Sequence, residues 1–188
     1  MPTWAWIVIA VVAALIVLAA VAAWMQQRKR DHLKERFGSE YDRTVSENDG
    51  RRAAEKELAE RERKRDQLDI VPLSPEAQQK YSSSWRDVQG RFVDDPGGAV
   101  NEADGLVTDV MRDRGYPIDD FEQRAADISV DHPEVVQNYR AAHAVYAKAS
   151  DGNGGASTED LRQGFVHYRA LFTELLETHD RAREEASR

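Results

Sequence analysis

The sequence predicts an all-α protein with one transmembrane helix, a charged helical stalk, and a compact bundle of about four helices plus a short helix. Three observations support this fold class. The segment Trp4–Met25 is entirely apolar. Elsewhere, apolar residues recur at spacings of three and four, as in amphipathic helices, and no segment alternates apolar and polar residues as a strand does. We expect the helix over 1–25, the stalk over 26–68, the bundle over 69–180 and a frayed tail over 181–188.

The N-terminal apolar segment is long enough to cross a bilayer. Between Trp4 and Met25 it contains only Ala, Val, Ile, Leu, Trp and Met, and such a helix covers a hydrocarbon core of about 30 Å. Trp4 and Trp6 at one end and Trp24 at the other have the positions of membrane-interface residues. The alternative is a cleaved signal peptide, which would give a secreted protein. The absence of a basic residue before the segment disfavours that alternative.

The charges that flank this segment predict its orientation. Arg28, Lys29 and Arg30 follow it, whereas no Lys or Arg precedes it. Positive flanks stay in the cytoplasm, so we expect a single-pass cell-membrane protein with its N-terminus outside and its C-terminal domain cytoplasmic. The chain has no cysteine, which excludes disulfides and thiolate metal sites.

The distal part of the chain is acidic. The net charge is −8, and residues 69–188 hold 13 basic and 23 acidic side chains, a balance of −10. Nucleic-acid binding needs a positive surface, so we expect no nucleic-acid partner. The lipid bilayer and a protein of unknown identity are the expected partners.

The predicted stalk, residues 26–68, has little apolar support. Its first half has a narrow stripe of Phe37, Tyr41 and Val45, and Ser46–Gly50 predicts a break. Its second half is dominated by Glu, Arg and Lys. A stable coiled coil needs apolar a and d positions over three or four heptads. The stalk is therefore predicted to be a solvated helical spacer.

Each predicted bundle helix combines a start signal with an apolar stripe. Capping residues, or a proline at the first helical position, mark the starts. In chain order these are Ser74-Pro75, Asp95-Pro96, Asp119 with Glu122, His132-Pro133, and Ser157 or Thr158. The stripes contain Tyr81, Trp85, Val88 and Phe92; Ala99, Ala103, Leu106, Val107 and Val110; Phe121, Ala125 and Ile128; Val135, Val136, Tyr139, Ala142, His143 and Tyr146; and Leu161, Phe165, Tyr168, Phe172 and Leu175 or Leu176. We expect the last helix to fray after His179.

Motifs that carry chemistry are sparse. The bundle histidines have no second metal ligand at helical spacing, and no nucleophile elbow, phosphate loop or EF-hand occurs. We therefore predict no catalytic residue, cofactor or metal site. The densest ionisable group is a speculative cluster of Arg124, Asp127, Asp131 and His132.

These observations favour a non-enzymatic, membrane-tethered helical domain that mediates protein–protein interaction. One alternative is a ligand-sensing domain with an aromatic pocket beside Tyr139, Tyr146 and Tyr168. A second is a hydrolase or transferase with its site around Asp127, Asp131 and His132. The sequence does not reveal the biological role, the partner or the oligomeric state.

Several strings also carry a resemblance over about residues 85–176. They are Arg91–Pro96, Arg114–Pro117, Asp120–Asp127, Asp131–Pro133 and Tyr139–His143. In these strings the chain resembles an uncharacterised family of bacterial, actinobacterial-type proteins with one N-terminal span and a C-terminal helical domain. The resemblance implies that domain boundary and carries no activity.

Overall fold

The computed structural model describes the backbone of residues 3–150 and 155–186, and the side chains of residues 12–149 and 155–177. Over this part of the chain every regular element is a helix and no strand occurs, which confirms the all-α prediction. The chain divides into two compact units, Met1–Leu58 and Ala59–Arg188.

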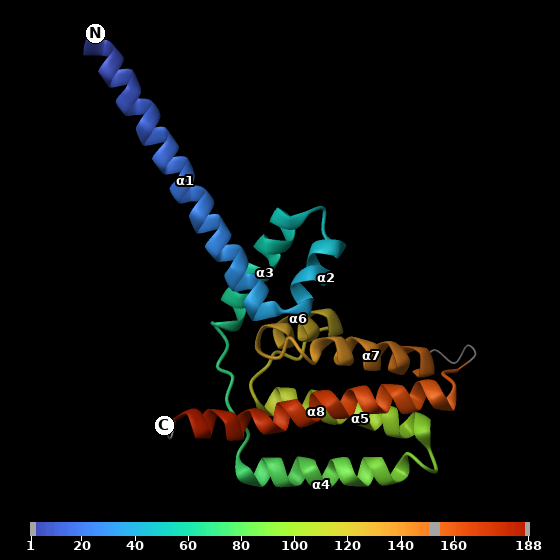
Figure 1. The fold of residues 1–188 in the computed structure, drawn as a ribbon. Helices are drawn as coiled ribbons and strands as arrows, with labels where there is room; N and C mark the ends of the chain where they lie inside the picture. The colour runs from blue at the N-terminus through green and yellow to red at the C-terminus, as the bar shows by residue number, and fades with distance from the viewer. Residues whose placement is uncertain (1–2, 151–154, 187–188) are drawn as a thin grey trace. The chain divides into compact units, whose positions relative to one another are not determined.

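The first unit contains α1 (Thr3–Phe37), α2 (Ser39–Glu47) and the start of α3 (Arg51–Arg65). Gly38 separates α1 from α2 with a φ of +49°, a conformation that favours glycine. The break predicted near Ser46–Gly50 is confirmed between α2 and α3 (Figure 1).

Over the residues described, we found no helix with the length and apolar character needed to cross a membrane. The transmembrane helix expected over residues 1–25 lies partly outside the described residues, because the side chains of residues 1–11 are not among them. The backbone of α1 continues from Thr3 through this segment to Phe37.

The first unit also buries apolar side chains, although a solvated spacer is expected there. The buried apolar residues are Leu33, Phe37, Tyr41, Ala54 and Leu58. The Tyr41 hydroxyl donates to Glu55 Oε1 at 2.9 Å and so links α2 to α3. Because Gly38 interrupts the helix, Phe37 and Tyr41 lie on two helices and not on one continuous stripe.

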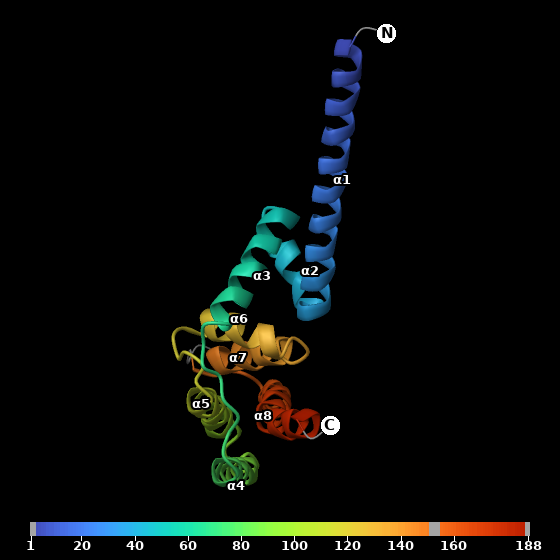
Figure 2. The ribbon, with the colours of Figure 1, turned by 90° about the vertical axis from the view of Figure 1, so that its left-hand side faces the viewer.

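The second unit is the predicted bundle of four longer helices and a short one. These are α4 (Pro75–Arg91), α5 (Pro96–Asp113), α6 (Phe121–Asp131), α7 (Val136–Ser150) and α8 (Thr158–Ala186). Figure 2 shows α4, α5 and α8 nearly end-on. Helix α5 packs against α4, α7 and α8, and α7 also packs against α6 and α8.

Three predicted caps are confirmed. Ser74 Oγ accepts from Ala77 N–H at 3.2 Å, and Asp95 Oδ1 accepts from Gly98 N–H at 2.9 Å. Ser157 Oγ accepts from the N–H of the third residue after it, at 3.1 Å. Each cap satisfies a backbone donor that the helix leaves free.

Two predicted starts differ from the structure. Asp120, and not Asp119, caps α6, because its Oδ1 accepts from Gln123 N–H at 2.9 Å. Helix α7 begins at Val136 and not at His132-Pro133. His132 donates its N–H to Ile128 O at 2.8 Å and therefore ends α6. Helix α8 continues past the expected fraying point at His179 to Ala186.

A tight contact joins the end of α5 to the segment that leads into α4. Gly115 has a φ of +93°, and a Cβ there would lie 2.4 Å from Asp69 O. Next to it, Val71 N–H donates to Arg114 O at 2.9 Å. This position therefore requires glycine for its conformation and for its space.

The bundle core contains most of the predicted stripe residues. Its buried side chains include Trp85, Val107, Ile128, Tyr139 and Tyr168. The stripes of α4 to α8 are buried together, as amphipathic helices require.

Candidate functional site

The four residues of the speculative cluster do not form one site. Arg124 points away from the other three: its Nε donates to Tyr139 Oη at 3.0 Å and its Nη1 to Asp119 O at 2.8 Å. Asp131 accepts from Arg65 Nε at 2.8 Å and from Tyr116 Oη at 2.8 Å. These contacts tie α6 to its neighbouring segments.

Asp127 is fully buried on α6. Its Oδ1 accepts from Gln123 Nε2 at 2.8 Å and lies 3.8 Å from Lys64 Nζ. Burial raises the pKa of this carboxyl group, and the nearby Lys64 opposes that shift. Arg61 also bonds to Ser129 Oγ at 3.3 Å. The end of α3 is therefore attached to α6. For this reason the second unit begins at Ala59, before residue 69, where the bundle is expected to start.

His132 is 3% exposed and has its Nδ1 3.3 Å from Glu174 Oε1. Burial lowers the pKa of His132, and the positive charge of Arg114 lowers it further. Asp127, Asp131 and His132 thus share no partner with one another. The two cavities described below are not lined by any of the three.

The tyrosines proposed to line an aromatic pocket belong mainly to the core. Tyr139 and Tyr168 are both 0% exposed. Tyr168 Oη donates to Asp104 at 2.8 Å, and burial raises the pKa of Tyr168 well above its usual range. Tyr146 lies beside the ring of His143, with 5.4 Å between the centroids. The same two cavities do not reach these tyrosines.

A cavity with a volume of about 460 Å³ lies between α4 and α8. This is within the range of ligand-binding clefts. A second cavity of about 270 Å³ lies beside it and shares Gln89 and Arg169 with it; we call the two together the α4–α8 groove. Its lining residues are Gln78, Ser82, Trp85, Arg86, Gln89 and Phe92 from α4 and its end, and Arg162, Phe165, Val166, Arg169, Phe172, Thr173, Leu176 and Glu177 from α8.

Aromatic rings form the floor of the groove. The ring of Trp85 stacks on Phe172 at 4.6 Å and on Phe165 at 5.0 Å between centroids, and Phe92 contacts Phe165 at 5.0 Å. Because both α4 and α8 pack on α5, these large side chains, and not close helix–helix contact, bridge the space between them.

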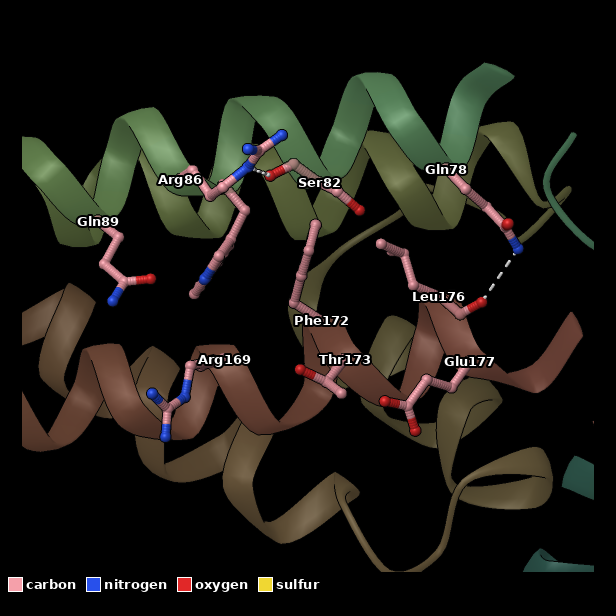
Figure 3. Close-up of a pocket in the computed structure, with 10 residues that line it drawn as sticks. Gln78, Ser82, Arg86, Gln89, Arg169, Phe172, Thr173, Leu176 and Glu177 are labelled. Atoms are coloured by element: carbon pink, nitrogen blue, oxygen red, sulfur yellow. Dashed lines mark hydrogen bonds between the residues drawn. The ribbon is translucent and has the colours of Figure 1, made fainter. Parts of the chain in front are cut away.

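The rim of the groove is polar and mainly positive. Figure 3 shows Arg86 and Gln89 on the α4 wall and Arg169 on the α8 wall. Arg86 Nε donates to Ser82 O at 3.3 Å, and Arg162 pairs with Glu159. Within the described part of the chain, neither Arg86 nor Arg169 forms an ion pair with a carboxylate. The rim of the groove therefore carries one guanidinium group on each wall.

One end of the groove differs in charge from the rest. There Gln78 Nε2 donates to Leu176 O at 3.2 Å, and Glu177 supplies a carboxylate (Figure 3). Neither here nor in any other described part of the chain do three or more His, Asp or Glu side chains form a group that could hold a metal ion.

The predicted membrane-interface residues are described only in part. The Arg28 guanidinium lies 4.1 Å from the centroid of the Trp24 ring, and Trp24 is 55% exposed. Lys29 is exposed and Arg30 is partly buried. The side chains of Trp4 and Trp6 lie outside the described residues.

Trp85, Phe165 and Phe172 are 6%, 7% and 4% exposed, which confirms the prediction that the aromatic stripes of α4 and α8 belong to the core. Sequence reasoning missed the groove that lies above these rings. Helical spacing identifies which side of α4 and α8 is apolar, but it does not show how far apart two helices lie. A usable signal is the presence of Arg86 and Arg169 one residue from the stripe on each helix.

No protein-family model matches the chain, and neither the curated proteins nor the solved structures contain a match. The resemblance to an actinobacterial-type family stays a prediction.

Proposed function

We propose that this chain is a non-enzymatic, membrane-tethered interaction domain that binds a partner protein through the α4–α8 groove. The groove carries the proposal, because it combines an aromatic floor with a polar rim in the way that protein-binding clefts do. Its lining contains Trp85, Arg86 and Arg169, and Trp and Arg are among the residue types that dominate binding energy at interfaces.

The tether is supported by the sequence. The apolar segment Trp4–Met25 has the length of a transmembrane helix, and Arg28, Lys29 and Arg30 follow it. We place the N-terminus outside the cell and the bundle in the cytoplasm. A domain held there would meet partners close to the inner face of the membrane.

Site-specific photo-crosslinking tests the interaction. Benzoylphenylalanine replaces Gln89 in the groove or, as a matched control, Asp87, which is exposed on the same helix outside the groove. We expect an adduct from position 89 and none from position 87. The crosslinked protein is then identified, purified and tested against the full chain in nanodiscs, where Thr173→Trp should fill the groove and abolish binding. Equal adducts from both positions, or binding unaffected by Thr173→Trp, would refute the proposal.

Cysteine labelling tests the topology, since the chain has no native cysteine. Ser83→Cys is exposed on α4 and should react with a membrane-impermeant maleimide only after the cells are opened. Thr3→Cys should react on intact cells. Labelling of Ser83→Cys on intact cells, or recovery of a protein trimmed before Trp24 from the medium, would contradict the proposed tether.

A further inference from the structure

We propose that the α4–α8 groove accepts an amphipathic α-helix of the partner, with carboxylates on both sides of its apolar stripe. This inference rests on the proposed function and specifies the chemistry of the partner. It follows from the length of the groove, the state of its backbone groups and the placement of its charges.

The length of the groove suits a helix of about four turns. Its lining extends from Gln78 to Phe92 along α4 and from Arg162 to Glu177 along α8. At about 1.5 Å per residue, each wall is about 20 Å long. A partner helix of about 14 residues has the same length.

The walls favour a helix over an extended peptide. An extended peptide gains affinity by pairing its backbone with a free strand edge. Both walls here are helices, whose backbone groups along the groove are already bonded within α4 and α8. A helical partner satisfies its own backbone groups, so it loses none of those bonds when it covers the floor. Its apolar stripe then contacts Phe92, Val166 and Leu176, the apolar lining residues that are exposed or partly exposed. The aromatic rings beneath them are at most 7% exposed.

The positive rim selects the charges beside that stripe. Arg86 stands on the α4 wall and Arg169 on the α8 wall (Figure 3), so one carboxylate on each side of the stripe would meet a guanidinium. The chain is strongly acidic overall, with a net charge of −8, and these arginines form no ion pair with a carboxylate in the described part of the chain. At the far end, Glu177 favours a Lys or Arg of the partner.

Designed peptides test this chemistry on the full chain in nanodiscs. The first probe is a 14-residue helical peptide with a Leu stripe flanked by Glu on both sides. The second carries Lys in place of every Glu, and the third is a scrambled form of the first that lacks the stripe. Fluorescence anisotropy of labelled peptide gives the affinity, with empty nanodiscs as the blank. For the second readout, the chain is labelled with 5-fluorotryptophan. The ¹⁹F resonance of Trp85 is identified because it is missing from the Trp85→Phe variant, and a shift of this resonance reports occupancy of the groove.

We expect the Glu peptide to bind and to shift the Trp85 resonance, and the Lys and scrambled peptides to bind at least about tenfold more weakly. The Arg86→Glu/Arg169→Glu variant should reverse the preference. Its affinity for the Glu peptide should fall about tenfold, and it should now bind the Lys peptide. Reversal of binding excludes loss of folding as the cause.

Three results would overturn the inference. The first is equal binding of the Glu and Lys peptides, and the second is an unchanged preference in the double variant. The third is self-association of the full chain that Thr173→Trp abolishes, because the occupant would then be a second copy. If any of these occurs while the crosslink at position 89 is lost in Thr173→Trp, the proposed function stands and only this partner chemistry is wrong.

Discussion

Replacing Gly115 by alanine tests whether the end of α5 requires glycine. A residue with a Cβ loses roughly 1–2 kcal/mol in a left-handed conformation, and Gly115 has a φ of +93°. The new Cβ would also lie 2.4 Å from Asp69 O. Relieving that overlap moves the segment before α4 and weakens the Val71 N–H···O Arg114 bond of 2.9 Å, at a cost of about 1 kcal/mol. We expect Gly115→Ala to reduce the free energy of unfolding by about 2–3 kcal/mol.

A second glycine on α5 is the matched control. Gly105 lies within the helix, and a Cβ there would meet nothing within 4 Å. Gly105→Ala should therefore stabilise the bundle by roughly 0.5–1 kcal/mol through helix propensity. The same substitution on the same helix is thus expected to have opposite signs at the two positions.

Urea unfolding of the full chain in detergent, followed by near-ultraviolet circular dichroism, measures both variants, because this signal reports the packing of aromatic rings. The slope of each transition should equal that of the unmodified chain. A Gly115→Ala variant within 0.5 kcal/mol of the unmodified chain, or an equal loss in Gly105→Ala, would refute the steric reasoning.

Three further predictions use the same unfolding assay. Arg65→Ala should lower the free energy of unfolding by about 1–2 kcal/mol, because Asp131 then loses a charge-assisted hydrogen bond of 2.8 Å. Arg63 is exposed on the same helix, so Arg63→Ala should be neutral, and equal effects of the two variants would contradict the role of the α3–α6 contact. Gly164→Ala should lower the free energy of unfolding by about 1 kcal/mol net, because a Cβ there would lie 2.9 Å from Val145 Cγ1 and the overpacking exceeds the gain in helix propensity. Adding Val145→Ala should remove part of that loss, and strictly additive effects of the two substitutions would contradict the steric explanation. Burial lowers the pKa of His132 in the folded chain, so the unfolded chain binds the proton more readily and stability should fall as the pH drops below about 6.5; His132→Gln should reduce the slope of stability against pH between 7 and 5, and an unchanged slope would show that other groups dominate.

The local features of the fold were predictable because they depend on neighbours in sequence. Ser74-Pro75 and Asp95-Pro96 are followed by free backbone donors that a nearby oxygen satisfies, whatever the rest of the chain does. The choice between Asp119 and Asp120 was not predictable, because both precede the same helix. It depends on the approach of the chain to α6, where Arg124 binds Asp119 O.

The features that failed depend on contacts between distant segments. Arg124, Asp127, Asp131 and His132 are close in sequence, yet their partners come from α3, α7, α8 and the segment after α5, as well as from α6 itself. Proximity in sequence therefore did not make them a site. The groove depends on the separation of α4 and α8, which no pattern within either helix records.

The arrangement that opens the groove also sets the order in which the bundle comes apart. Among its four longer helices, α4 has a close backbone contact only with α5 and reaches α8 through side chains, whereas α5, α7 and α8 each lie close to more than one of the others. A helix with fewer close helix–helix contacts detaches at a lower free energy than its neighbours. The amide hydrogens of α4 should exchange fastest among the four, and proteases should cut first in the turn between Phe92 and Asp95, leaving a remnant of α5, α6, α7 and α8.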